Sequence, residues 1–222
     1  MADVAVVTDS CASIPPALVA ALGIAWVPYY VHRGQEVLRD LVSVQGPEFY
    51  AWLETAETLP TTAAPGPGDY FELYRQLAAA GTRDIVSLHM TSKGSAAYQA
   101  ATLGAEMLSA VLPEARVVVI DTLNVSMCTG WLAIEAARAA RAERPLADVV
   151  AHVRRLLPQA RMLQTADTLK YLYMGGRIGR ATHLVGSLLS IKPIISMEDG
   201  VIVPLGRART RQKAYRLMVD LL

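Results

Sequence analysis

The amino-acid sequence predicts an α/β protein with a mainly parallel sheet flanked by helices, followed by a second, smaller α+β domain. Two observations predict this fold class. Short apolar runs alternate with helical segments up to about residue 160, as in chains whose parallel strands are joined by helices. Beyond Pro158 the elements become shorter. With 53% hydrophobic residues among 222, the chain can bury a sizeable core.

The first elements can be read from apolar runs and their stop signals. Val4–Val7 is an apolar run that ends at a polar turn, which predicts a strand. Pro15-Pro16 then opens a helix, and Gly23 ends it. The segments that follow are predicted as strands at 24–31 and 35–41, a helix at 47–56, a loop at 59–68 and a helix at 69–80.

The next elements keep the same alternation. Ile85–Leu88 reads as a buried strand before a polar turn, and Ser95 opens a long helix to about Leu112. A strand at 117–120 and Ala-rich helices at 126–142 and 146–157 complete a domain that we place at residues 1–160. In the second domain, 161–222, Asp199-Gly200 predicts a hairpin turn. The chain stops inside an apolar helix, so we expect this domain to be C-terminally truncated.

Composition excludes several classes of function. The 21 Lys and Arg nearly balance the 20 Asp and Glu, so no basic field for nucleic acid is expected. The amino-terminal residues lack the regions of a secretion signal, and no apolar run reaches about 20 residues. We therefore expect a cytoplasmic protein with only transient membrane contact. Cys11 and Cys128 form neither a disulfide framework nor a metal motif, and we expect no cofactor or metal.

Four loops carry short hydroxyl side chains. Three of them follow the carboxyl ends of predicted strands, where open α/β sheets bind ligands, and the fourth is Thr61-Thr62. Hydroxyls and backbone N–H groups at a helix N-terminus can hold a carboxylate or a phosphate. For single residues, helix caps at Ser10, Ser95 and Ser126 and a turn at Asp9 remain the alternative. The candidate ligand-binding residues at strand ends are Thr8, Asp9, Ser10, Thr91, Ser92 and Ser95.

Common catalytic motifs are missing from the sequence. No Gly-x-Ser-x-Gly elbow occurs, and Lys93-Gly94-Ser95 lacks the glycine spacing of a phosphate-binding loop. We interpret the four histidines as surface or supporting residues: His32, His89, His152 and His183. The segment 175–179 can present Arg177 on a glycine-rich turn, and Arg209 lies in a basic cluster. One interpretation is that these arginines belong to a solvent-exposed basic surface without a specific function, and the sequence spacing alone favours it. The other is that they bind an anion or an acidic partner protein.

Taken together, the motifs resemble the DegV family along nearly the whole chain. Each motif is short, but their order and spacing are specific. The matching stretches are Thr8-Asp9-Ser10, Pro60-Thr61-Thr62, Thr91-Ser92 with Ser95, Asp121 with Ser126, Tyr171-Leu172, Gly175-Gly176-Arg177-Ile178-Gly179, Ile191-Lys192-Pro193-Ile194 and Arg209-Thr210. The sequence departs from the family pattern at Ala63-Ala64 and Ala96-Ala97, where hydroxyl residues or a glycine are usual.

The resemblance implies two α/β domains with a fatty acid in a tunnel between them. It also implies the binding subunit of a bacterial fatty acid kinase, in which a catalytic subunit phosphorylates the bound carboxylate to an acyl phosphate. Thr62 and Ser95 match the hydroxyls that bind the carboxylate, and Arg177 and Arg209 match arginines that we assign to the kinase-facing surface. The chain would then be a carrier for a long-chain fatty acid rather than an enzyme.

Two alternatives stay open at this point. The first is an enzyme that acts on a small carboxylate or phosphorylated metabolite in the inter-domain cleft, with Asp9 and Arg177 as its reactive residues. The second is a shortened relative that acts only by binding another protein.

Overall fold

The computed structural model describes residues 4–187 and 191–221 of the chain. These form two compact units, Met1–Gln159 and Ala160–Leu222. Each unit has its own sheets and helices, and each is described by itself below.

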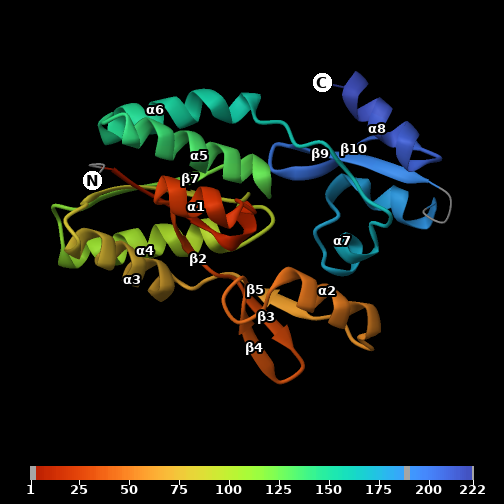
Figure 1. Cartoon of the computed structure of the whole chain (residues 1–222), viewed down its shortest axis with the longest axis horizontal. Helices are drawn as coiled ribbons and strands as arrows, with labels where there is room; N and C mark the ends of the chain where they lie inside the picture. The colour runs from red at the N-terminus through yellow and green to blue at the C-terminus, as the bar shows by residue number, and fades with distance from the viewer. Residues whose placement is uncertain (1–3, 188–190, 222) are drawn as a thin grey trace. The chain divides into compact units, whose positions relative to one another are not determined.

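The first unit is built on a four-stranded sheet in the order β2-β1-β6-β7. All neighbouring strands in it are parallel, which confirms the predicted α/β class (Figure 1). The bounds of its strands are β1 Val4–Asp9, β2 Ala25–Val27, β6 Asp84–His89 and β7 Arg116–Asp121. The predicted single strand at 24–31 is wrong, because it breaks after Val27 at Pro28, which has no N–H for a sheet ladder.

Helices cover both faces of this sheet (Figure 1). On one face, Tyr70 and Tyr74 of α3 and Leu108 of α4 pack over β1 and β6 with no exposed surface. On the other face, α5 buries Ile134 and five alanines, which let it approach the strands closely. The helix bounds are α1 Pro16–Leu22, α3 Pro67–Ala79, α4 Ala97–Val111, α5 Met127–Arg141 and α6 Leu146–Leu156, with the short 3₁₀ turns Ser10–Ala12 and Leu157–Gln159.

A small antiparallel sheet, β4-β3-β5, also belongs to the first unit. The sequence predicted a loop over 59–68, but Thr61–Ala63 forms β5 and pairs with β3. The loop prediction was therefore wrong at these three residues. The bounds of the other elements are β3 Tyr30–Arg33, β4 Glu36–Arg39 and α2 Gly46–Thr55.

The second unit is α+β, with an antiparallel sheet in the order β10-β9-β8. The predicted Asp199-Gly200 turn joins β9 to β10, and both residues have positive φ, of 50° and 75°. This is the backbone conformation that a two-residue hairpin turn of this type requires. The bounds are β8 Gln164–Thr165, α7 Lys170–Met174, a 3₁₀ segment Gly179–Ser187, β9 Lys192–Glu198, β10 Val201–Ala208 and α8 Arg211–Asp220.

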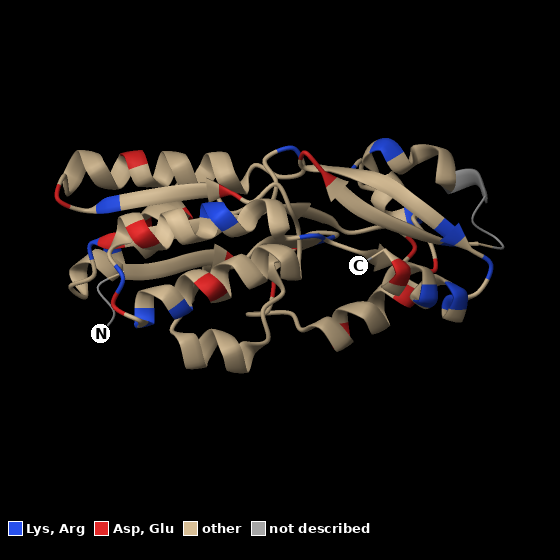
Figure 2. Ribbon diagram, turned by 90° about the horizontal axis from the view of Figure 1, so that it is seen from above, with Lys and Arg blue, Asp and Glu red and all other residues tan. Residues whose placement is uncertain are grey.

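In Figure 2, acidic and basic positions are interspersed along the helices of the first unit. Within residues 4–187 and 191–221, no helix is both long enough and apolar enough to cross a bilayer.

Candidate functional site

Polar residues meet at one edge of the parallel sheet because three neighbouring strands end there. β1 ends at Asp9, β6 at His89 and β7 at Asp121. His89 and Asp121 are register partners, and the pairing of Val7 with Ser87, continued two residues further, puts Asp9 beside His89. The loops predicted to carry the site thus leave the sheet side by side.

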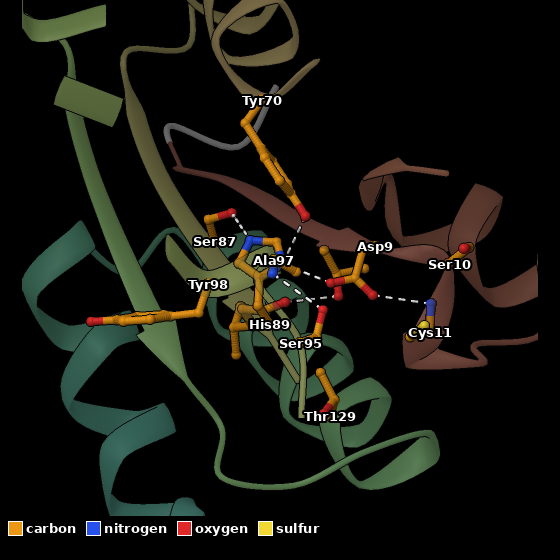
Figure 3. Close-up of polar contacts among 12 residues, drawn as sticks. Asp9, Ser10, Cys11, Tyr70, Ser87, His89, Ser95, Ala97, Tyr98 and Thr129 are labelled. Atoms are coloured by element: carbon orange, nitrogen blue, oxygen red, sulfur yellow. Dashed lines mark hydrogen bonds and ion pairs between the residues drawn. The ribbon is translucent and has the colours of Figure 1, made fainter. Parts of the chain in front are cut away.

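Asp9 and His89 form a buried hydrogen-bonded pair (Figure 3). His89 Nδ1 lies 2.8 Å from Asp9 Oδ2, and neither side chain has exposed surface. The second oxygen, Asp9 Oδ1, accepts the N–H of Cys11 at 3.0 Å and so caps the 3₁₀ turn Ser10–Ala12. Both oxygens of Asp9 are therefore occupied, which satisfies a buried carboxylate.

The network continues behind the histidine. His89 Nε2 lies 2.7 Å from Ser87 Oγ, which accepts the hydroxyl proton of Tyr74 at 2.8 Å. Asp9, His89 and Ser87 thus follow the order of a catalytic triad. Ser87 is wholly buried under Tyr74, however, so a substrate has no access to it, and we interpret the chain as a rigid support for the Asp9 turn.

The interpretation of His89 as a surface or supporting residue missed its burial. Its side chain is fully enclosed, and Tyr70 packs edge-on against the ring with centroids 4.9 Å apart. The signal that could have found it is positional, because Asp9 and His89 each end an apolar strand of six residues.

Thr8 and Ser10 hold the strand end in place. Thr8 Oγ1 donates to the carbonyl of Leu88 at 2.9 Å, and Ser10 Oγ accepts the N–H of Tyr29 at 3.1 Å. Both residues are buried. Their hydroxyls thus stabilise the fold around the site, which is a structural use of residues that the sequence put forward as ligand contacts.

Ser95 lies where its hydroxyl can face a ligand. It precedes α4, whose first helical residue is Ala97, so the helix begins two residues later than predicted. Ser95 Oγ accepts the N–H of Ala97 at 3.2 Å and lies 2.6 Å from the hydroxyl oxygen of Tyr29. The N-terminus of this 15-residue helix carries a partial positive charge, which favours an anion beside Ser95.

Asp121 accepts hydrogen bonds that stabilise the loop before Ser95. Its carboxylate accepts the N–H of Ser92 at 3.2 Å and the N–H of Leu123 at 2.9 Å. Thr91 Oγ1 accepts the N–H of Lys93, and the N–H groups of Gly94 and Ser95 both point to the Thr91 carbonyl. Ser92 and Thr91 thus contribute to a tight turn that fixes the position of Ser95.

Thr62 lies in β5, which pairs with β3. It is the register partner of Val31, and residues directly opposite each other in a sheet project from the same face. Tyr29 lies immediately before β3, which begins at Tyr30. Thr62 is exposed, and the residue that contacts Ser95, Tyr29, immediately precedes the strand with which β5 pairs.

Ser126, which the sequence suggested as a helix cap, occupies the N-cap position of α5 but makes no capping bond. Its hydroxyl donates instead to Ser13 Oγ at 3.2 Å.

Arg177 and Arg209 are exposed in the second unit, Arg177 in the turn after α7 and Arg209 between β10 and α8. Arg177 Nη1 donates to the carbonyl of Gly175 at 2.6 Å.

A cavity of about 660 Å³ adjoins the Asp9 turn. Thr8, Asp9 and Ser10 form its polar side, and the rest is largely apolar. The main apolar residues are Ile14, Val19, Ile24, Ala25, Trp26 and Leu41. Its volume is within the range of about 300–1,000 Å³ usual for small-molecule sites. In the described part of the chain, no group of three His, Cys, Asp or Glu side chains could hold a metal ion.

Comparison with known proteins gives one consistent family. A family model described as "Uncharacterised protein, DegV family" matches residues 3–222. A DegV domain-containing protein of Streptomyces coelicolor is 35% identical over 218 residues, which cover 98% of this chain and 75% of the relative.

Solved structures agree with the family match. A DegV family protein from Thermus thermophilus, described for its fatty acid binding, has a TM-score of 0.89 at 30% identity, covering 98% of this chain and 76% of the other. A stearic acid-binding protein from Eubacterium ventriosum has a TM-score of 0.89 at 26% identity, covering 97% and 74%.

Proposed function

The chain belongs to the DegV family, and from this premise we propose that it binds a long-chain fatty acid by its carboxylate and presents it to a partner kinase. The fatty acid named for the Thermus and Eubacterium proteins supports the class of ligand. In this proposal the chain is a carrier, and the kinase catalytic subunit transfers the phosphoryl group that turns the carboxylate into an acyl phosphate.

The observation that carries the proposal is the position of Ser95 at the start of α4. A carboxylate that leaves water is costly unless donors replace its hydration. Ser95 offers a hydroxyl beside the partial positive charge of a long helix. This combination favours an anionic head group over a neutral one.

Thr62 is the second proposed donor. It lies opposite Val31 of β3, two residues beyond Tyr29, the residue in contact with Ser95. An exposed threonine in a strand does not contribute to the core, so its hydroxyl is free to serve a ligand rather than the fold. Two hydroxyls from separate elements can then each donate a hydrogen bond to one oxygen of the carboxylate.

The acyl chain requires only apolar lining, at about 0.8 kcal/mol for each buried CH₂. The cavity beside Asp9 and Ser10 can accommodate part of an acyl chain, because the volume of the cavity is adequate and most of its lining is apolar. We propose that part of the tail lies there.

Arg177 and Arg209 are the proposed contacts with the kinase. Both are exposed, and a guanidinium suits either an acidic partner surface or a phosphate. In contrast, the proposal of an enzyme based on Asp9 loses support, because both oxygens of Asp9 already accept hydrogen bonds.

Native mass spectrometry of the purified chain tests this function. We expect a mass shift of one fatty acid, either carried from the host or after addition of oleate. A protein that shows no bound lipid and no response to added oleate would contradict the proposal.

A further inference from the structure

The hydroxyls of Tyr29 and Ser95 form a close pair. Their oxygen atoms are 2.6 Å apart, at the short end of hydrogen-bond lengths between hydroxyls. Tyr29 has 8% of its surface exposed, and its backbone N–H donates to Ser10 Oγ, so the residue is held at its backbone as well as at its hydroxyl. Tyr29 was not among the residues predicted for the site.

A count of protons shows what this pair can offer to a ligand. A serine hydroxyl has one proton and two lone pairs. The N–H of Ala97 occupies one lone pair of Ser95 Oγ. If Tyr29 donates to the other, both acceptor positions of Ser95 are filled, and the single Ser95 proton can only point outward.

By geometry alone, either hydroxyl of the pair could be the donor. Burial, and then the negative charge of Asp9, raise the pKa of Tyr29. The phenol therefore keeps its proton at physiological pH and remains a donor. A phenol is also more acidic than an aliphatic alcohol and is the stronger donor of the two.

We propose that Tyr29 is a positioning residue for the ligand carboxylate, which fills the last lone pair of Ser95 and so turns the Ser95 proton toward the bound anion. This inference rests on the proposed fatty acid binding and deepens it. A hydroxyl that accepts two hydrogen bonds is polarised and donates more strongly. The pair therefore selects an ionised carboxylate over an ester or an alcohol.

The test is a titration of the full chain with oleate and with methyl oleate, which has the same acyl chain but no charge. We expect Tyr29→Phe to weaken oleate binding about 3- to 10-fold, the effect of one lost neutral hydrogen bond, and to leave methyl oleate binding unchanged. Ser95→Ala should weaken oleate binding by about 10-fold or more, since it removes the donor itself.

The double variant separates positioning from direct contact. On the Ser95→Ala background, Tyr29→Phe should have no further effect, because Tyr29 acts through Ser95. On a Ser95→Thr background, which keeps the hydroxyl, its effect should persist. Tyr30→Phe is the matched control, since it removes a neighbouring hydroxyl that donates to Asp69 at 2.9 Å rather than to Ser95.

Each outcome is decisive. Equal losses for oleate and methyl oleate in Tyr29→Phe, or an additive loss on the Ser95→Ala background, would overturn the positioning role. Unchanged oleate binding in Tyr29→Phe would overturn it as well. If the wild-type chain binds neither lipid, the proposed function itself fails and this inference fails with it.

Discussion

Asp9 and His89 form a pair at the ends of two parallel strands, with Oδ2 and Nδ1 2.8 Å apart and no exposed surface on either side chain. The pair ties β1 to β6 and holds the turn that borders the cavity. Removal of one partner leaves a buried polar group without its bond.

We therefore expect Asp9→Ala to lower the free energy of unfolding by about 3 kcal/mol. Urea unfolding followed by circular dichroism measures this. Asp84→Ala is the control, since it removes a carboxylate that pairs with exposed Arg116 at the surface, and its effect should be small. Equal stability of wild type and Asp9→Ala would contradict the supporting role of the pair.

The position of the Asp9 turn also depends on Gly130 in α5. A Cβ at Gly130 would collide with the carbonyl oxygen of Ala12, within the 3₁₀ turn that Asp9 caps. Gly130→Ala should cost about 1–3 kcal/mol and weaken oleate binding, because the turn must move. Gly68→Ala in α3 meets no atom within 4 Å and should be neutral or stabilising. Equal stability and equal oleate affinity of the two variants would exclude close packing at Gly130 as the cause of the predicted losses.

The proposed tail site predicts a dependence on acyl chain length. Ala20→Phe adds a ring at an exposed position of α1 that lines the cavity, and should weaken binding of an 18-carbon acid more than that of a 10-carbon acid. Ala17→Phe adds the same ring on the exposed side of α1 and should change neither affinity. Calorimetric titration with both acids measures the difference. Equal losses for the two acids would count against a tail in this cavity.

Buried tyrosines predict a loss of stability in alkali. Burial raises the pKa of Tyr29, Tyr70 and Tyr74 above the ordinary value of 10.0. Between that value and the folded pKa, the unfolded chain has released protons that the folded chain retains, so the free energy of unfolding falls as pH rises. The stability should be fully present below about pH 10. Urea titrations from pH 8 to 11 test this, and a constant free energy across that range would contradict it.

The kinase proposal predicts a separation of two activities. Charge reversal by Arg177→Glu with Arg209→Glu should leave oleate binding intact and reduce acyl phosphate formation when a bacterial fatty acid kinase and ATP are added. Arg154→Glu, an exposed change on α6, is the control. Unchanged acyl phosphate formation in the double variant would remove these arginines from the docking surface.

The fold was largely predictable because apolar runs and stop signals are local. Val4–Val7, Gly23 and Asp199-Gly200 each determine their own segment, and all three agree with the structure. Pro28 was the missed local signal, since it splits the predicted second strand. β5 was missed for a different reason, because Thr61–Ala63 is a strand only through its pairing with β3.

The sequence predicted which loops lie at the site, but it did not predict the hydrogen bonds between their side chains. The position of the loops follows from the order of parallel strands. The contacts of His89 with Asp9 and of Tyr29 with Ser95 join residues 80 and 66 positions apart, which no local pattern reveals. The sequence also could not tell that Thr8 and Ser10 use their hydroxyls within the fold.

The central claim is that Ser95 and Thr62 bind a fatty acid carboxylate through hydrogen bonds from their hydroxyls. Oleate titration of wild type and of Thr62→Ala with Ser95→Ala tests it most directly, with thermal unfolding as a check on folding. We predict that the folded double variant binds oleate at least about 100-fold more weakly, as expected when two bonds to a charged group are lost. Wild-type affinity in a folded double variant would contradict the account.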